Sequence, residues 1–397
     1  MTGRNHCFIF LAVGIIGISP VGFSETAIEI YGKLYPELAS VKTSRGTPPV
    51  SFVSPLSGLP SGNSPSLHCD LQESNSRIGA RGELQLGKKV AAFFQVEAKV
   101  PFDSLSSSSF TPRETFVGIR SRFGSIRLGN FETVYRQLGD TTGFFGIRSG
   151  NFVSNSSILS KPGFGNSSSA SFHLRRGDSV EYASPGISGF QFRIQYSLDE
   201  MISSSVNADL WSLGATYERG PFYLAIAHEI HNDFFGGSKS VPSELSNVSN
   251  LDASSKDSAT RLALAFARGR TKIEIDFALV EYRESGGEIG NFEDYRRGSW
   301  SLAIDHRLGE WRFSAAYAAA GVGTGRLVGK APCSTKGLNG NQFSLGAALS
   351  FSKQLFIYGI LARLNNGHSA RYSNLDSSDP DLGADITQIA FGICYLF

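Results

Sequence analysis

The sequence lacks long hydrophobic runs and any marked excess of charge. Beyond its N-terminus, none of the 397 residues belongs to an apolar stretch long enough for a membrane-spanning helix, which excludes a helical membrane protein. The formal net charge at pH 7 is only +2, so the chain carries no electrostatic footprint of nucleic-acid binding. Neither absence excludes a membrane β-barrel, because barrel strands alternate apolar and polar residues and escape a hydropathy window.

Cysteine and methionine are also scarce, with four and two residues respectively. If Cys7 is removed with an N-terminal segment, then Cys69, Cys333 and Cys394 remain, an odd number that fits neither a disulfide framework nor a zinc spacing. Cys69 and Cys333 both fall in expected loops on the same side, and a bridge between them stays an open alternative. We expect no metal site and no cofactor.

The N-terminal segment has the pattern of a secretory signal peptide. Arg4 lies in a polar start, residues 7–18 are apolar, and Pro20 follows with small residues beyond it. We expect residues 1–24 to be cleaved during export and residues 25–397 to form the mature protein. A buried N-terminal helix is the alternative interpretation.

Glycine and aromatic residues are abundant: 44 Gly, 30 Phe and 13 Tyr, which suits a β-rich chain with tight turns and aromatic girdles. Period-two alternation bounded by turn residues predicts sixteen strands and almost no helix. The predicted strands are residues 28–42, 76–86, 89–100, 112–121, 124–132, 178–185, 190–198, 209–219, 222–231, 259–268, 271–283, 297–308, 311–320, 341–351, 354–365 and 385–397.

Short and long connections alternate along the chain. Every second connection is a tight turn, as at Gly220, Gly269 and Gly309, and the intervening ones are long and polar. In a meander this places all turns at one end and all long loops at the other, which is the geometry of an outer-membrane barrel with periplasmic turns and extracellular loops. An even strand count places both termini on the periplasmic side.

Each predicted strand has one apolar face. In residues 385–397, Ile389, Phe391 and Ile393 alternate with the small or polar residues Ala390 and Gly392. A soluble barrel would show the same alternation, but its polar face would point outward and its connections would not alternate so regularly between short and long. We therefore predict an all-β fold, a 16-stranded antiparallel transmembrane β-barrel whose closed sheet surrounds a water-filled lumen.

The inward face predicts a row of charged side chains along the lumen. The first strand contributes Lys33, the second Arg77, Arg81 and Glu83, and the fourth Arg113. A row of cations in a channel attracts anions and disfavours cations. The alternative is an ordinary polar wall in which the arginines are paired with carboxylates.

The longest connection, residues 133–177, is rich in glycine and phenylalanine. Loops of this length without structure of their own are usually functional or disordered. Phe144, Phe145, Phe152 and Phe164 make this one too apolar to extend freely into water. We expect the loop to fold into the barrel, bury these rings against the wall and narrow the pore.

Several phrases together resemble a known family. Four segments are similar, in their order and in their residues, to the general, typically trimeric porins of Gram-negative outer membranes. They are IEIYGK, SRIGARGELQLGKKVAAFFQVE, RETFVGIRSRFGSIRLGNF and DSVEYASPGISGFQFRIQY. The resemblance implies a homotrimer in outer-membrane lipid, with a third loop inside each pore and passive diffusion of small hydrophilic solutes and ions. It also implies that Tyr395 and Phe397 form a C-terminal signal for the barrel-assembly machinery.

The resemblance further implies a pore constriction with a basic wall opposite acidic loop residues. By motif, the basic side includes Lys33, Arg77 and Arg113, and either Arg175 or Arg176. Where relatives often carry a glutamate in a Pro-Glu-Phe-Gly-like phrase, this chain has Phe144 and Phe145, which leaves Asp140 as the main nearby acid. We therefore expect a weak anion preference.

Two other functions stay open: an outer-membrane barrel enzyme of lipase or protease type, and a surface adhesin built on the same barrel. An enzyme would need a nucleophile with a histidine and an orienting partner in reach. His228 and His231 are three apart in a predicted strand, so they point to opposite faces. An adhesin would use the long loops at residues 44–69 and 234–257.

Overall fold

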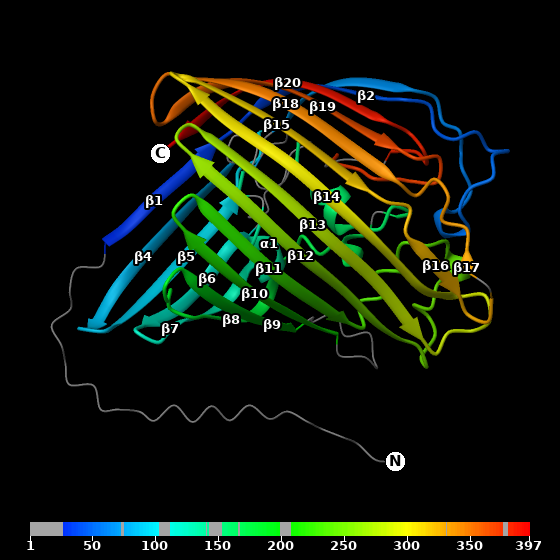
Figure 1. Ribbon diagram of the computed structural model, residues 1–397, viewed down its shortest axis with the longest axis horizontal. Helices are drawn as coiled ribbons and strands as arrows, with labels where there is room; N and C mark the ends of the chain where they lie inside the picture. The colour runs from blue at the N-terminus through cyan, green and yellow to red at the C-terminus, as the bar shows by residue number, and fades with distance from the viewer. Residues whose placement is uncertain are drawn as a thin grey trace, which may run out of the picture.

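The structure, a computed structural model, describes residues 27–72, 75–102, 112–139, 141–142, 153–165, 167–198, 208–330, 332–375 and 380–397. The expected signal peptide, residues 1–24, lies outside the described residues. All described strands belong to one antiparallel sheet that curls round on itself (Figure 1).

The strands are β1 Ala27–Leu34, β2 Glu37–Thr43, β3 Ser66–Gln72, β4 Arg77–Gly87, β5 Val90–Lys99, β6 Pro112–Ser121, β7 Gly124–Glu132, β8 Arg175–Ala183, β9 Phe190–Leu198, β10 Asp209–Arg219, β11 Phe222–Asn232, β12 Ser254–Arg268, β13 Thr271–Ser285, β14 Phe292–Leu308, β15 Trp311–Ala320, β16 Thr324–Leu327, β17 Pro332–Cys333, β18 Gly340–Ser350, β19 Leu355–Asn366 and β20 Ile386–Leu396. The helical segments are α1 Val134–Gln137, α2 Ser156–Ser160, η1 Pro55–Ser57, η2 Ser168–Ala170 and η3 Ser243–Leu245.

Sixteen strands form the wall, as predicted. β1 and β2 are two parts of the first wall strand, and β3 and β4 are two parts of the second. β16 and β17 form a hairpin in the connection between β15 and β18. Every predicted strand is present, and among the described residues the predictions missed only β3 and this hairpin. No helix among the described residues is long and apolar enough to cross a membrane.

The barrel closes between its first and last strands. Both β1 and β2 pair with β20. Phe397 completes the seam, since Gly32 N–H donates to Phe397 O at 2.9 Å and Phe397 N–H donates to Gly32 O at 3.1 Å. A Cβ on residue 32 would lie 2.2 Å from the Phe397 ring, so glycine is required for this close approach. Closure pairs the backbone groups of the outermost strands, which lipid demands.

The first wall strand breaks at Pro36, between β1 and β2. Proline has no N–H to give to the ladder. The neighbouring groups are satisfied in other ways: Tyr35 N–H donates to Ser76 Oγ at 2.9 Å, and Pro36 O accepts from Ile393 N–H at 3.2 Å. The break therefore leaves these backbone groups paired.

The wall has an apolar outer face and a mostly polar or small-residue inner face. On β20, Ile389, Phe391 and Ile393 are between 44% and 67% exposed, whereas Ala390 and Cys394 are fully covered on the inside. The same alternation places Ile273 and Phe277 of β13 outside. The predicted orientation of the strands is confirmed, and the outer belt suits contact with hydrocarbon.

The tight turns at one end depend on glycine. Gly220, Gly269 and Gly309 each begin a two-residue turn and each has a φ of 60°. Positive φ at this position is strained for residues with a side chain, so glycine lets adjacent strands fold back in register.

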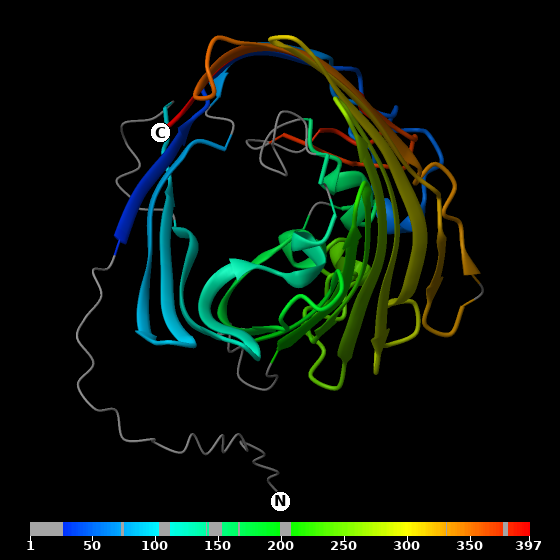
Figure 2. The same ribbon diagram turned by 60° about the vertical axis from the view of Figure 1, so that its left-hand side comes forward.

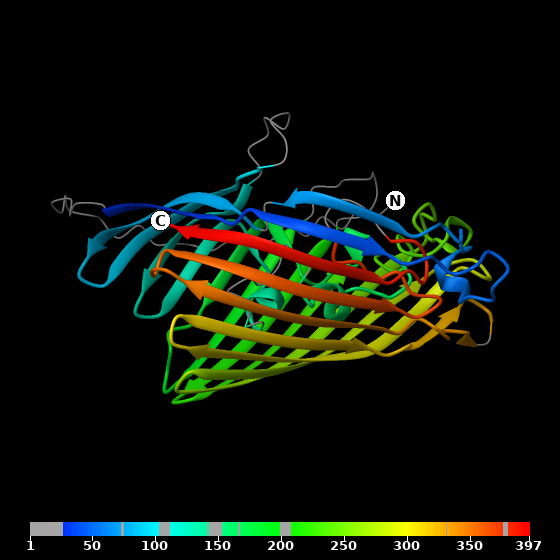
Figure 3. The ribbon, with the colours of Figure 1, turned by 90° about the horizontal axis from the view of Figure 1, so that it is seen from above.

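The wall is higher on one side than on the other. β6, β7, β8 and β9 have 9 or 10 residues, whereas β12, β13 and β14 have 15 to 17. Figure 3 shows the long strands running the length of the barrel. The charged residues discussed below lie on the low side.

The described parts of the third long loop lie inside the barrel, as expected (Figure 2). α1 packs on β9, β10 and β11, with Val134 and Tyr135 buried. Phe164 is 1% exposed, and its ring meets the Tyr295 ring edge-on at a centroid distance of 4.9 Å. Asp140, Phe144, Phe145 and Phe152 lie outside the described residues. The loop thus fills part of the lumen with apolar side chains.

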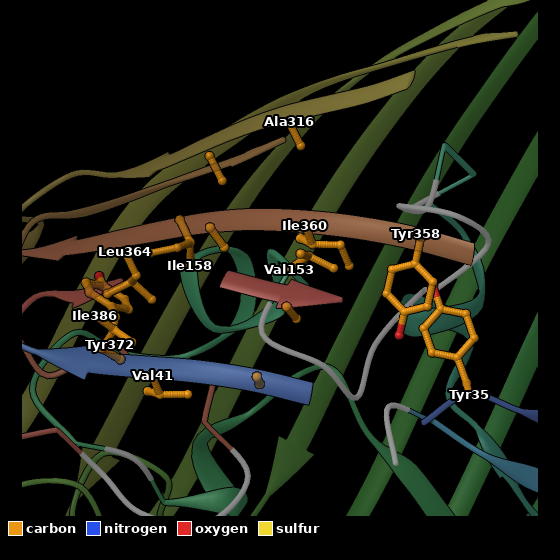
Figure 4. Packing of buried hydrophobic residues seen from close by; sticks show 14 of the residues in the cluster. Tyr35, Val41, Val153, Ile158, Ala316, Tyr358, Ile360, Leu364, Tyr372 and Ile386 are labelled. Carbon is orange, nitrogen blue, oxygen red and sulfur yellow. The ribbon is translucent and has the colours of Figure 1, made fainter. Parts of the chain in front are cut away.

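A second apolar cluster fixes α2 to the high side of the barrel (Figure 4). Ile158 of α2 packs into a cluster with Ala316, Ile360 and Leu364 of the inner wall. Small residues on these inner faces leave space for the loop. The cluster and α2 therefore fill this side of the lumen, and the polar passage runs along the opposite wall.

The structure corrects the interpretation of the cysteines. Cys69 is an exposed residue of β3, part of a wall strand and not of a loop, whereas Cys333 lies in the β16–β17 hairpin of the long connection between β15 and β18, as expected. Both thiols are free, as is that of Cys394. The bridge left open from the sequence does not form.

The long loop at residues 44–65 packs against the last long loop, which includes residues 367–375 and 380–385. Thr47 Oγ1 donates to His368 O at 2.8 Å, and Ser57 Oγ donates to Ser369 O at 2.6 Å. Asp381 accepts hydrogen bonds from Asn63 N–H, at 2.9 Å, and from a serine hydroxyl of the same loop. This carboxylate therefore ties the two loops together.

We expect this tie to loosen in acid. Partial burial raises the pKa of Asp381, but hydrogen bonds from Ser61, Asn63 and Leu382 outweigh burial and hold the pKa below its ordinary value. Because the folded-state pKa is depressed, the stabilisation is complete above the unfolded-state pKa of about 3.9 and is lost as pH falls through the folded value.

Amide hydrogen exchange of residues 44–65, corrected for its intrinsic pH dependence, checks this expectation. Protection should be high at pH 7 and should fall below about pH 4. Asp381→Ala should already lack protection at pH 7 and lose little more in acid. Equal protection of the unmodified protein at pH 2 and pH 7 would contradict the assignment.

Candidate functional site: the charged lumen wall

The polar passage is lined by a cluster of charged side chains on the low side of the barrel, which we call the charged wall. Its members project from β4 to β9 and from α1. They comprise six arginines and four glutamates: Arg77, Arg113, Arg127, Arg136, Arg175 and Arg193, with Glu97, Glu114, Glu132 and Glu181.

Glu97 of β5 is the first hub of the charged wall. It lies 3.2 Å from Arg77 Nε and 2.8 Å from Arg113 Nε, and it accepts a hydrogen bond from Tyr31 OH at 3.0 Å. Glu97 is 4% exposed, whereas the Arg77 and Arg113 side chains are 30% and 15% exposed. The carboxylate is therefore behind the two arginines, which reach further towards the water.

A β-bulge directs Arg113 to the lumen. Val117 and Ile119 of β6 face outward, so a regular strand would also turn Arg113 outward. The register with β5 shifts between Val96 and Ala98, so that two residues of β6 stand opposite Glu97. The expected position of Arg113 is thus reached through a bulge that parity did not predict.

The second hub decides between Arg175 and Arg176. Arg175 Nε lies 2.9 Å from a Glu114 oxygen, and an Nη lies 3.1 Å from Glu132. Arg176 instead has its guanidinium carbon 4.4 Å from the centre of the Phe234 ring. The structure brings Arg175, and not Arg176, into the charged wall.

The third hub was not singled out from the sequence. Glu181 of β8 lies 2.9 Å from Arg127 and 3.4 Å from Arg193. Gln137 of α1 donates to Glu181 at 2.7 Å and accepts from Arg193 at 2.7 Å, which joins the loop to the wall. The inward parity of Arg127, next to the outward Leu128, was the available signal.

Lys33 and Arg81 lie apart from the three hubs. Lys33 is 7% exposed, with Nζ 4.3 Å from the centre of the Tyr35 ring, so it is buried in the wall. Arg81 pairs with Glu29 through two bonds of 2.9 and 2.7 Å, and its side chain is 52% exposed.

The third long loop reaches the opposite wall at Glu274 of β13. This buried carboxylate accepts from Thr141 N–H at 2.9 Å, from Thr141 Oγ1 at 2.6 Å and from Thr142 N–H. Lys272 Nζ donates to Thr141 O at 2.7 Å. The loop therefore crosses the lumen and is anchored on both sides.

Comparison with known proteins identifies the family. A model described as Gram-negative porin matches residues 11–369, which is most of the chain. The chain belongs to the Gram-negative porin family. A relative of the porin is the major outer membrane protein P.IB of Neisseria lactamica, 23% identical over 242 residues, covering 60% of this chain and 67% of the relative. P.IB of Neisseria meningitidis serogroup A is 26% identical over 166 residues, 40% of this chain and 44% of the relative.

Solved structures share the fold of the porin. An anion-selective porin from Comamonas acidovorans superposes with a TM-score of 0.69 at 18% identity, covering 94% of this chain and all of that one. The trimer form of OmpT from Vibrio cholerae gives 0.61 at 15% identity, and OmpF of Salmonella typhi, in complex with daunomycin, gives 0.58 at 16%. Family and fold together make the protein a channel of the outer membrane.

Proposed function

We propose that the porin is a non-enzymatic channel through which small hydrophilic solutes and ions diffuse passively, with a weak preference for anions. The observation that carries the preference is the composition of the charged wall. Its six arginines and four glutamates have a formal excess of two positive charges. Such an excess beside a narrow aqueous path concentrates anions there.

The preference is weak because the charges are paired. Each glutamate of the charged wall is shared by two arginines, so the field that reaches a passing ion is that of the excess alone. Arg77, Arg113 and Arg175 act directly in this proposal. Lys33 adds to the potential, and Arg81 belongs to the same basic side although Glu29 offsets its charge. The loop residues Asp140, Phe144 and Phe145 form the proposed opposite side of the constriction.

Planar-bilayer recording tests the channel and its preference. Purified porin in a tenfold KCl gradient should give stepwise conductance. Its reversal potential should be displaced from zero towards the chloride equilibrium potential, by less than for an ideal anion channel. A reversal potential on the potassium side would overturn the preference. Hydrolysis of lipid or peptide substrates by the same preparation would overturn the non-enzymatic assignment.

We further propose that three copies assemble in outer-membrane lipid after removal of residues 1–24, with the barrel-assembly machinery acting on the C-terminal strand. The seam between Phe397 and Gly32 supports a role for this strand in closure, and Tyr395 stacks beside Phe397 at 6.1 Å. Conductance steps in multiples of three would support the trimer. Phe397→Ser should lower the yield of folded barrel, seen as loss of the heat-modifiable band.

One observation favours an additional surface-binding role. Val50, Phe52 and Leu59 in the loop at residues 44–65 are 97%, 74% and 91% exposed. Exposed apolar side chains on one loop can mark a contact site. The enzyme alternative gains no such support: within the described part of β11, His228 faces outward and His231 lies buried inside.

A further inference from the structure

Two aromatic rings lie against glycines of the neighbouring strand along the polar passage. Tyr31 is paired across strands with Gly79, and Phe93 is paired with Gly118. A Cβ on Gly79 would lie 2.7 Å from the Tyr31 ring, and one on Gly118 would lie 2.5 Å from the Phe93 ring. Glycine on the neighbouring strand, because it has no side chain, therefore leaves the space that each ring occupies.

An arginine stands over each of these rings. Arg81 follows Gly79 by two residues, and Arg120 follows Gly118 by two residues. Each arginine therefore lies on the same inward face as its glycine. Their guanidinium carbons lie 5.0 Å from the Tyr31 ring centre and 4.8 Å from the Phe93 ring centre. These distances are typical of cation–π contacts.

The aromatic surface continues from Phe93 to Phe116. The two ring centres are 6.0 Å apart in an edge-to-face arrangement. Arg127 lies 4.9 Å from the centre of the Phe116 ring. Each of these three inward-facing rings is therefore accompanied by a cation.

The two outer arginines are accessible. The side chains of Arg81 and Arg120 are 52% and 55% exposed. Arg120 donates one Nη1 hydrogen bond, of 2.8 Å, to Glu83, and because a guanidinium group has five N–H donors it can bond a ligand as well. A cavity of about 580 Å³ is lined by Phe93 and Phe116 and by charged side chains in which arginine exceeds glutamate by one: Arg81, Arg120, Arg127 and Arg193, with Glu29, Glu83 and Glu181.

We propose that this cavity is a binding subsite for small aromatic carboxylates. Their carboxylate accepts hydrogen bonds from the Arg120 fork, and their ring packs against Phe93, Phe116 and the guanidinium groups. Acetate has the same charge but no ring, so it makes only the first contact, and a saturated ring lacks the π contact with the guanidinium groups. The subsite rests on the proposed channel function, because solutes reach it only through an open lumen.

Solute block of the KCl current tests the subsite at constant ionic strength. Benzoate should reach half-block at a concentration about three- to tenfold lower than acetate, as expected for an added ring contact. Cyclohexanecarboxylate should resemble acetate more than benzoate. Equal half-blocking concentrations for benzoate and acetate, or for benzoate and cyclohexanecarboxylate, would overturn the proposal.

Variants with unchanged charge locate the subsite. Phe93→Leu should remove most of the difference between benzoate and acetate, whereas Phe93→Tyr should keep it. Phe313→Leu, at a ring 44% exposed on the outer face, is the matched control and should change nothing. A Phe93→Leu channel that retains the full difference would overturn the assignment.

Two further measurements keep the result interpretable. Arg120→Gln should weaken block by both benzoate and acetate, and unchanged block would overturn the role of Arg120. This variant tests the subsite even if Phe93→Leu does not form channels. The reversal potential in KCl is read in the same membranes. A porin that prefers chloride but does not distinguish benzoate from acetate loses the subsite alone, and loss of chloride preference counts against the proposed function.

Discussion

Replacing both Arg77 and Arg113 with glutamate is expected to convert the weak anion preference into a cation preference. Both arginines pair with Glu97, at 3.2 and 2.8 Å. The double substitution changes the formal charge of the charged wall from +2 to −2. Charges a few ångströms from a passing ion act with about 1 kcal/mol even in bulk water, so the permeability ratio should shift roughly tenfold or more.

Reversal potentials in a salt gradient measure this shift. Arg77→Lys with Arg113→Lys is the matched control, because it preserves charge and should preserve the sign of the preference. Three adjacent carboxylates strain the wall, so Arg77→Gln with Arg113→Gln provides a milder test and should give an intermediate value. Unchanged selectivity in channels that still fold would show that the constriction lies elsewhere.

Glu274→Ala is expected to release the third long loop from the opposite wall. The substitution removes the acceptor of three hydrogen bonds from Thr141 and Thr142. Hydrogen bonds to a charged group contribute roughly 1.5–3 kcal/mol each, so the equilibrium between docked and undocked loop should move by tenfold or more. Single-channel conductance should rise and the open current should become noisier.

Single-channel recording with two matched variants checks this result. Glu274→Gln keeps one acceptor oxygen and should fall between the unmodified porin and Glu274→Ala. Lys272→Met removes one further contact to Thr141 and should have a smaller effect of the same sign. A Glu274→Ala channel as quiet and as narrow as the original would mean that the loop is held by its apolar contacts alone.

Much of the fold could be predicted because its determinants are local. Alternation along a strand depends on neighbours two residues apart, and a turn depends on the two residues at its centre, as at Gly220 and Gly269. β3 escaped prediction because it has only seven residues and follows a proline-rich loop, although Leu67, Cys69 and Leu71 alternate with polar residues. Its place is fixed by pairing with β2, a partner distant in sequence.

The site was predicted in part. The alternation of side chains along the strand was enough to place Arg77 in the lumen. The position of Arg113 depends on a bulge, and the choice of Arg175 over Arg176 depends on the register shift between β7 and β8. Arg127 and Glu181 were overlooked because nothing in the sequence shows which of many inward charges meet. The loop residues Asp140, Phe144 and Phe145 stay predictions.

The sequence by itself determined a sixteen-stranded outer-membrane barrel, because strand period, turn spacing and the apolar outer face are each written in short stretches of chain. The tertiary structure alone decided which carboxylate each arginine shares, which side of the lumen the loop fills, and which rings rest on glycine. These features depend on register between strands and on the path of the third loop, where contacts join residues far apart in the chain and a shift of one position exchanges the faces.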